Sequence, residues 1–375
     1  LLRNASSDMY HWSRLAILAI ASSSVGLPAF AEFRYENNSG GDVLLYGQFD
    51  PAYLSFDDGV STTSEIVDNT NSNSRVGLDL HQPYGEDTFR FNFETALGLR
   101  PSAGVSQTNT PSGVDWDRTD IRKVDFSYET ASIGTFYAGQ GSMATDGVAE
   151  EDFSGTTLVT YSSVPDTAGG FEFRTSAGAL SGITIGDNFS NFDGGRRGRV
   201  RYDSPTFAGF TVSAAWGTEI LQKGNDDDFM DIALRYAGEF GSVKLHGAVG
   251  FSRRDSNGTN RDDTIGSISM LHDSGFNATL ALGDRKGGGD YTYGKLGYIG
   301  SWLSAGTTAL SVDYYDGSDA ISSGSSAGSL GVGVVQKVDR ANMEVYLGYR
   351  TYELSETTQS YQDASSVLFG TRLKF

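Results

Sequence analysis

Three arginines alternate near the middle of the chain, in the run Arg-Arg-Gly-Arg-Val-Arg-Tyr. Successive side chains of an extended backbone point to opposite faces. Arg197, Arg199 and Arg201 therefore share one face of a strand, and Val200 and Tyr202 share the other. Three like charges on one strand face repel each other unless acidic groups oppose them. The spacing predicts a basic surface that faces groups of opposite charge.

The segment that precedes this strand contains such groups. Residues 141–195 show no clear periodicity and are far longer than an ordinary connection between strands. The carboxylates that we expect to oppose the arginines are Asp146, Glu150, Glu151 and Asp152. Opposed charges across a narrow water gap create a transverse field, which orders water and dipolar solutes and disfavours apolar ones. This is the chemistry of a selective aqueous passage.

The elements that must position these groups are strands. Phe89, Phe91 and Phe93 face one way, whereas Arg90 and Glu94 face the other, and similar alternation recurs along the chain. Aromatic residues make up 12% of the sequence, which has 48 glycines and only 7 prolines, as expected for many strands joined by tight turns. A soluble sandwich also alternates. Strands of roughly ten residues repeated over a whole chain instead indicate a membrane β-barrel.

The connections between the predicted strands alternate in length. Short turns at 83–87 and 204–209 contrast with longer polar loops such as 57–73, 100–118 and 254–263. Membrane barrels have short turns at one rim and long loops at the other, and a sandwich has no reason to sort its connections in this way. The alternation is the strongest argument for a barrel.

The number of strands gives a check on this interpretation. The alternating segments include a short candidate at 170–177, but a single-chain bacterial barrel has an even number of strands. The short turn after the arginine strand makes that strand a descending one, so a single long loop must precede it. We therefore place 170–177 inside the 141–195 loop, which leaves sixteen strands and makes the arginine strand the sixth.

The N-terminal segment is predicted to be a secretory signal peptide. Arg14 precedes a short apolar run at 15–21, and a Pro-Ala-Phe-Ala sequence ends at Ala31. We expect cleavage after Ala31, which leaves one domain at 32–375, and Met9 could be the initiator. The remaining chain has no apolar run long enough for a membrane helix. The net charge of the full sequence, −19, argues against nucleic acid as a partner.

The final strand ends in an alternating apolar pattern. Phe369, Leu373 and the terminal Phe375 share one face, which we expect to meet lipid while the strand pairs with the first strand at 43–54. A terminal strand of this kind resembles the insertion signal that the outer-membrane assembly machinery reads. We expect these three residues to carry that signal.

Several short motifs, in this order and spacing, resemble Gram-negative general porins of the proteobacterial type. They are Leu45-Tyr46-Gly47-Gln48, Ser74-Arg75-Val76-Gly77-Leu78, Val200-Arg201-Tyr202-Asp203-Ser204-Pro205 and the closing strand. The resemblance implies an all-β fold: a 16-stranded antiparallel transmembrane β-barrel with short periplasmic turns, long outer loops and an inward-folded third loop. It also implies a homotrimer in the outer membrane that contacts the lipid bilayer, lipopolysaccharide and the assembly machinery, and that lets small hydrophilic solutes and ions diffuse passively.

The resemblance also implies which residues form the basic side of the constriction. They are Arg75, Lys123, Arg197, Arg199 and Arg201. In the fourth strand, parity turns Lys123 inward and Arg122 outward unless a bulge shifts the strand. The Pro-Glu-Phe-Gly-Gly loop motif of enterobacterial porins is missing, and its nearest counterpart is the Phe-Asp-Gly-Gly sequence at 192–195. The pore diameter of enterobacterial porins therefore cannot be assumed for this chain.

Two other functions remain as alternatives. One is an outer-membrane channel specific for an anionic or sugar substrate. The other is a barrel enzyme, but His81, His246 and His272 are isolated and no G-x-S-x-G motif leads from a strand into a helix. No cofactor is expected, although the acidic loops could bind calcium, which takes several carboxylate oxygens. Charge reversal of the arginine set is expected to raise cation preference.

Overall fold

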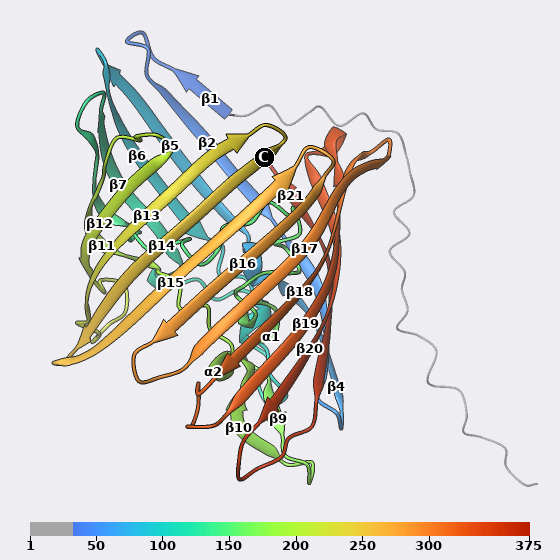
Figure 1. Cartoon of the computed structure of the whole chain (residues 1–375). Helices are drawn as coiled ribbons and strands as arrows, with labels where there is room; N and C mark the ends of the chain where they lie inside the picture. Colours follow the sequence, from blue (N-terminus) through green and yellow to red (C-terminus); the bar gives the residue numbers. More distant parts are fainter. Residues whose placement is uncertain (1–32) are drawn as a thin grey trace, which may run out of the picture.

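The computed structural model describes residues 33–375, so the predicted signal peptide and the initiator at Met9 lie outside the described residues. The described chain forms a closed antiparallel barrel of sixteen strands, as predicted (Figure 1). Among the described residues, no helix is long and apolar enough to cross a membrane.

Each wall strand pairs with its neighbour in the sequence, because short hairpin connections favour antiparallel pairing. The wall strands are β2 (Asp42–Phe49) with its continuation β3 (Pro51–Asp57), β5 (Arg75–Tyr84), β6 (Asp87–Ala96), β7 (Ile121–Thr130), β8 (Gly134–Ser142), β11 (Arg196–Asp203), β12 (Phe210–Thr218), β13 (Asp228–Phe240), β14 (Val243–Ser256), β15 (Thr259–His272), β16 (Phe276–Arg285), β17 (Asp290–Leu303), β18 (Gly306–Ser318), β19 (Ser326–Val338), β20 (Met343–Ser355) and β21 (Ala364–Lys374). The arginine strand is β11, the sixth wall strand, and it pairs directly with β8.

The last strand closes the barrel against the first. β21 pairs with both β2 and β3, and the backbones of Gly47 and Phe375 exchange hydrogen bonds of 2.8 and 3.0 Å. β1 (Phe33–Glu36) pairs with the first half of β2, and β4 (Thr62–Asp68) forms a hairpin with β3 at the opposite end of the barrel (Figure 1). The edges of the first and last strands are thus paired, which removes the exposed edge that an open sheet would present.

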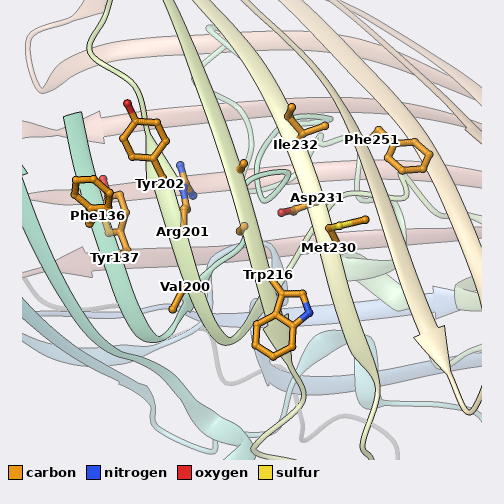
Figure 2. A pocket seen from close by; sticks show the side chains of 12 residues that line it. Phe136, Tyr137, Val200, Arg201, Tyr202, Trp216, Met230, Asp231, Ile232 and Phe251 are labelled. Carbon is orange, nitrogen blue, oxygen red and sulfur yellow. The ribbon is translucent and has the colours of Figure 1, made fainter. Parts of the chain in front are cut away.

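The two faces of the wall differ as the alternation predicts. On β13, Ile232 and Leu234 are exposed on the outer surface, whereas Asp231 and Ala233 are buried on the inner one. Figure 2 shows this region, with Trp216 and other apolar side chains around a shallow groove of about 770 Å³. An apolar band on the outside is what a surface in contact with lipid requires.

Aromatic rings gather near the rim that carries the short turns. Phe276 and Tyr298 lie with their ring centroids 4.8 Å apart, and Tyr236 lies 4.7 Å from Phe210 on the neighbouring strand. Trp302 stacks on Tyr298 at 5.5 Å. Amphipathic rings of this kind form the girdles that outer-membrane barrels place at the membrane–water interface.

One predicted loop is wrong. The segment 254–263 is mostly strand, because β14 runs to Ser256 and β15 starts at Thr259. Asn257 and Gly258 join the two strands with φ angles of 52° and 82°. Two successive residues with positive φ form the tight hairpin turn that matches the twist of paired strands, so the strands extend beyond the point where the sequence turns polar.

The remaining elements lie in the connections. They are η1 (Thr70–Ser72), η2 (Ser102–Gly104), η3 (Arg118–Asp120), α1 (Pro165–Ala168), β9 (Glu172–Arg174), β10 (Leu180–Thr184), α2 (Ile185–Asn188) and η4 (Asp339–Ala341). β9 and β10 form a separate two-stranded sheet within the loop that joins β8 to β11. The candidate strand at 170–177 is therefore not part of the wall.

Gly47 offers a test of barrel closure. A Cβ atom at this position would lie 2.6 Å from the Phe375 ring, so only glycine leaves room for the terminal aromatic side chain. We expect Gly47→Leu to reduce the folded fraction, seen as a weaker heat-modifiable band in gel electrophoresis, since such overpacking costs roughly 1–3 kcal/mol. Gly294→Leu is the control, because a Cβ there meets nothing within 4 Å. Equal loss in both variants would contradict this account of closure.

Candidate functional site

The segment 143–195 folds into the barrel and is anchored to one side of its inner wall. Asp231 on β13 accepts hydrogen bonds from the backbone amides of Ala144 and Thr145, at 3.1 and 2.8 Å. Arg235 on the same strand donates to the carbonyl oxygens of Ala144 and Asp146, both at 2.8 Å. These inward polar side chains satisfy loop backbone groups that would otherwise be buried without partners.

Further anchors follow along β15, β17 and β18. The Ser267 hydroxyl donates to the Val148 carbonyl oxygen at 2.6 Å. The Lys295 ammonium group donates to the Thr160 carbonyl oxygen at 2.7 Å. The Tyr315 hydroxyl donates to the Ser190 carbonyl oxygen at 2.8 Å. The loop is therefore fixed to several wall strands at intervals along its length.

An apolar core inside the barrel strengthens this attachment. Phe171 of the loop stacks on Phe56 of β3 with centroids 4.1 Å apart, and Phe189 packs edge-on against Tyr315 and Tyr352. All five rings have little or no exposed surface. Burial of whole aromatic side chains contributes large apolar areas, so the loop and this side of the wall form one packed unit.

The loop covers only part of the inner wall. The inward residues of β15 to β20 that are buried include Ile265, Ser267, Ser269, Thr279, Ala281, Tyr291, Tyr293, Lys295, Ser311, Asp313, Tyr315, Ser329, Val335, Tyr346, Arg350 and Tyr352. Most of the corresponding inward polar residues of β5 to β7 are half-buried or exposed, namely Asp79, His81, Arg90, Asn92, Asp125 and Ser127, whereas Glu94 on β6 is buried. The open part of the lumen therefore lies beside β5, β6 and β7.

Basic side chains gather on this open side around a single carboxylate. Arg122 donates through Nε to Glu94 Oε1 at 2.6 Å, and Arg75 Nε lies 3.5 Å from Glu94 Oε2. Lys123 is the cross-strand partner of Glu94. Arg122 also donates to Asn73 Oδ1 at 3.2 Å. A single carboxylate, that of Glu94, therefore lies beside three basic side chains.

Arg122 does not point outward, because β7 contains the bulge for which strand parity left room. The pairing of β6 with β7 shifts between Glu94 and Thr95, so that Lys123 and Ile121 pair with consecutive residues and Arg122 is the extra residue. Such a bulge redirects a side chain and breaks simple alternation. Arg122 and Lys123 therefore both lie near Glu94 on the inner face.

The arginines of β11 have partners on the wall itself. Arg199 makes two hydrogen bonds of 2.8 Å to the Asp125 carboxylate, and its side chain is 1% exposed. Arg201 binds Asp203 in the same bidentate way, at 2.7 and 2.8 Å, and donates to the Met143 carbonyl oxygen. These two guanidinium groups are therefore neutralised on the wall and hold the start of the loop.

The predicted opposition between Glu150, Glu151 and Asp152 and the arginine strand is wrong. Glu150 accepts hydrogen bonds from Tyr161 and Asn191, at 2.5 and 2.9 Å. Glu151 lies 3.3 Å from His246 and Asp152 lies 2.8 Å from Lys295. The loop turns these acids toward itself and toward its own anchoring strands, because it packs against the opposite side of the wall.

Asp146 is the predicted loop acid that comes nearest to the basic residues of β11. Its Oδ2 lies 4.0 Å from a terminal nitrogen of Arg196, a residue that the sequence interpretation did not select. Arg197 stacks over the Phe229 ring at 4.1 Å, and its Nε lies 3.8 Å from Glu219. The signal that could have identified Arg196 is its position at the end of the loop, where strand parity no longer decides the side-chain direction.

No group of three or more His, Cys, Asp or Glu side chains in residues 33–375 could hold a metal ion. The calcium hypothesis therefore has no ready-made ligand cluster in this part of the chain.

The loop contains a half-buried acidic group, Asp166, whose titration can be tested. Burial raises the pKa of Asp166 from 3.8 to about 7, and the nearby Glu150 carboxylate adds to this rise. Between these two values the unfolded chain has lost the proton that the folded loop retains, so this residue lowers stability as the pH rises. We expect Asp166→Asn to be more stable than the parent at pH 8 and to differ little at pH 4. The measurement is the melting temperature of the folded gel band of both proteins between pH 4 and pH 8. If the two temperatures changed with pH in parallel, the raised pKa of Asp166 would be contradicted.

The closed barrel, its apolar outer belt and its partly filled polar lumen define an outer-membrane channel. The sequence model of Gram-negative porins matches residues 6–357, and the chain belongs to this family. The protein is accordingly one of the outer membrane of Gram-negative bacteria. Comparison with curated protein sequences gives no match.

Solved structures support the fold. The anion-selective porin from Comamonas acidovorans superposes with a TM-score of 0.60 at 16% identity, covering 89% of this chain and 100% of that one. OmpF of Salmonella typhi, solved with daunomycin, superposes with a TM-score of 0.56 at 14% identity, and the match covers 91% of this chain and 100% of that one. The outer-membrane channel DcaP of Acinetobacter baumannii superposes with a TM-score of 0.57 at 10% identity, and the match covers 91% of this chain and 99% of that one. At such identities the likeness concerns the fold alone.

Proposed function

We propose that the protein is a passive channel for small hydrophilic solutes and ions, and that it has no enzymatic activity. The observation that carries this proposal is the difference between the two sides of the inner wall. The loop buries many inward residues of β15 to β20, whereas most of the polar inward residues of β5 to β7, Glu94 excepted, keep contact with solvent. A lumen that is polar where it is open passes water and hydrated solutes.

The experiment is conductance in planar bilayers with the purified mature chain. We expect steady ionic current and a heat-modifiable shift in gel electrophoresis. Folded protein that gives no current would overturn the channel, and lipase assays would then test the enzyme alternative.

We also propose a homotrimer that contacts the lipid bilayer and lipopolysaccharide and that reaches the membrane through the assembly machinery. The assembly machinery would recognise the apolar side chains of Phe369, Leu373 and Phe375 on the last strand. Two of them, Phe369 and Phe375, are exposed on the outer surface. OmpT of Vibrio cholerae, which has been solved in a trimer form, shares the fold with a TM-score of 0.55. Chemical cross-linking in native membranes should give a band at three times the monomer mass, and a monomer alone would contradict the trimer.

A channel with a preference for anions is the second candidate. It is favoured by the basic side chains Arg75, Arg122 and Lys123, which lie on the open side around the single carboxylate of Glu94. The total charge of −19 would favour cations, but the charges nearest the narrow part of a pore dominate its selectivity.

A further inference from the structure

Four carboxylates of the loop cluster where three of its segments meet, and the passage of solutes does not use them. They are Asp146, Glu150, Asp166 and Asp193. Asp193 accepts the backbone amides of Gly147 and Ala149, at 2.6 and 2.8 Å. Its carboxylate therefore holds residues 191–193 against the turn at 146–150.

Glu150 joins the third segment to the other two. One of its oxygens accepts from the Tyr161 hydroxyl at 2.5 Å, and the other accepts from the Asn191 amide at 2.9 Å. Asp166 lies in the same segment as Tyr161, close enough to feel the charge of Glu150. All four acids are half-buried. The cluster thus ties together the segments 146–150, 161–166 and 191–193.

Basic side chains do not neutralise this cluster. A terminal nitrogen of Arg196 lies 4.0 Å from Asp146 Oδ2, which is too long for a hydrogen bond. In residues 33–375, no basic nitrogen lies within 4.0 Å of a carboxylate oxygen of Glu150, Asp166 or Asp193. The hydrogen bonds of these three acids therefore come from neutral groups.

The charged groups on the wall strands around the cluster have partners of their own. They are Arg235 on β13, bound to loop carbonyl oxygens, His246 on β14, beside Glu151, Arg285 on β16, bound to Asp263, and Lys295 on β17, bound to Asp152. Tyr291 on β17 and Tyr315 on β18 add only neutral hydroxyl groups. If all four acids were ionised, their charges would be largely uncompensated.

These surroundings favour the protonated form of the acids. Burial raises the pKa of Glu150, Asp166 and Asp193, that of Asp166 to about 7, and the neighbouring carboxylates add to each rise. A released loop would expose the same acids to water, where they have ordinary pKa values. Between the ordinary and the raised values, the attached loop keeps protons that the released loop gives up. Attachment is therefore strongest in acid and weakens as the pH rises.

We propose that Asp146, Glu150, Asp166 and Asp193 form a proton-dependent latch, which holds the loop against the wall in an acidic medium and loosens it in an alkaline one. Ionised carboxylates that share one site repel each other, so loss of the protons separates the three segments. The turn at 146–150 then withdraws from the wall, where Val148 and Ala149 are buried in the core. The space left for solutes beside the loop varies with pH as a result.

The experiment measures how fast a water-soluble thiol reagent labels Ala281→Cys in folded protein at pH 5 and pH 8. Ala281 on β16 is 1% exposed and lies in the same core as Val148 and Ala149, and the sequence contains no other cysteine. Division by the rate for Ser127→Cys, on the open side, removes the effect of pH on the thiol itself. The corrected rate should rise at least about tenfold, since each proton lost on release changes the equilibrium about tenfold per pH unit. It should remain slower than labelling at Ser127 throughout.

Two sets of substitutions in the Ala281→Cys background test the cluster itself. Glu150→Gln/Asp166→Asn keeps the shape of both side chains but removes their ionisation, so the rise should fall at least about threefold. The matched control is Glu172→Gln/Asp187→Asn, which removes two negative charges from the same loop outside the cluster. Its side chains accept backbone amides in other turns, both at 2.8 Å, and it should respond as the parent does.

The outcomes separate the latch from the channel function. A corrected rate that stays constant with pH in the parent, or that rises equally in the Glu150 and Asp166 variant, would overturn the latch. Asp166→Asn alone should also reduce the rise, which keeps the latch testable if the double variant folds poorly. Labelling is read as a mass increase of folded protein, so these results do not depend on conductance. Absence of current would overturn the channel and leave the latch standing.

Discussion

Arg199→Met is expected to destabilise the barrel by about 3–5 kcal/mol, because it removes one partner of a buried ion pair. The guanidinium group is 1% exposed and holds both oxygens of Asp125 at 2.8 Å. It also donates to the carbonyl oxygens of Ser142 and Gly139. The substitution leaves an uncompensated carboxylate on the inner wall and frees the start of the loop.

The measurement is the urea concentration at which the heat-modifiable folded band disappears. Arg253→Met is the matched control, because Arg253 makes a comparable bidentate pair with Asp262 but its side chain is 41% exposed. Exposed pairs contribute about 0–1 kcal/mol, so the control should unfold close to the parent. Similar losses in both variants would contradict the structural role assigned to Arg199.

This result also changes the expectation for charge reversal. Reversing Arg197, Arg199 and Arg201 together would place new carboxylates beside Asp125 and Asp203, so the barrel would be damaged before selectivity could be read. Ion selectivity should therefore be tested with substitutions of the arginines that face the open lumen.

Arg75→Gln/Arg122→Gln is expected to shift the channel strongly toward cations. The two substitutions remove two positive charges from the open side and leave the Glu94 carboxylate with Lys123 as its remaining basic neighbour. Fixed charges that line the narrow part of a pore set the sign of the ions that enter it. The reversal potential in a tenfold salt gradient should move by tens of millivolts, since for a monovalent salt it is bounded at about 59 mV on either side of zero.

Lys244→Gln/Arg340→Gln serves as the control, because it removes two positive charges at the short-turn rim, far from Glu94. Its reversal potential should match that of the parent. If the Arg75 and Arg122 variant also kept the parent value while remaining folded, these residues would not control selectivity.

The wall of the barrel was predictable from the sequence because it depends on local alternation and on hairpin connections. Phe89 to Glu94 alternate without interruption, and the even count required for closure correctly assigned the arginine strand as the sixth. Parity also placed Arg199 and Arg201 on the inner face, where they bind Asp125 and Asp203.

The candidate site was less predictable, because it depends on contacts between distant segments. The bulge at Arg122 is invisible to a rule of strict alternation. The side on which the loop docks depends on partners such as Asp231 and Lys295, which lie far along the chain. The loop acids were therefore assigned to the arginines, whereas Glu150 and Asp152 bind groups on the loop and its anchoring strands.

The central claim is that water fills the lumen beside β5 to β7 and that the loop seals the other side. The sequence contains no cysteine, so single cysteines can report which inward residues meet water. Ser127 lies on the open side, and Ser311 is 7% exposed beneath the loop. The most direct measurement is bilayer conductance during treatment with a charged, water-soluble thiol reagent. We predict that Ser127→Cys loses conductance and that Ser311→Cys does not. The reverse pattern would contradict the proposed path of the pore.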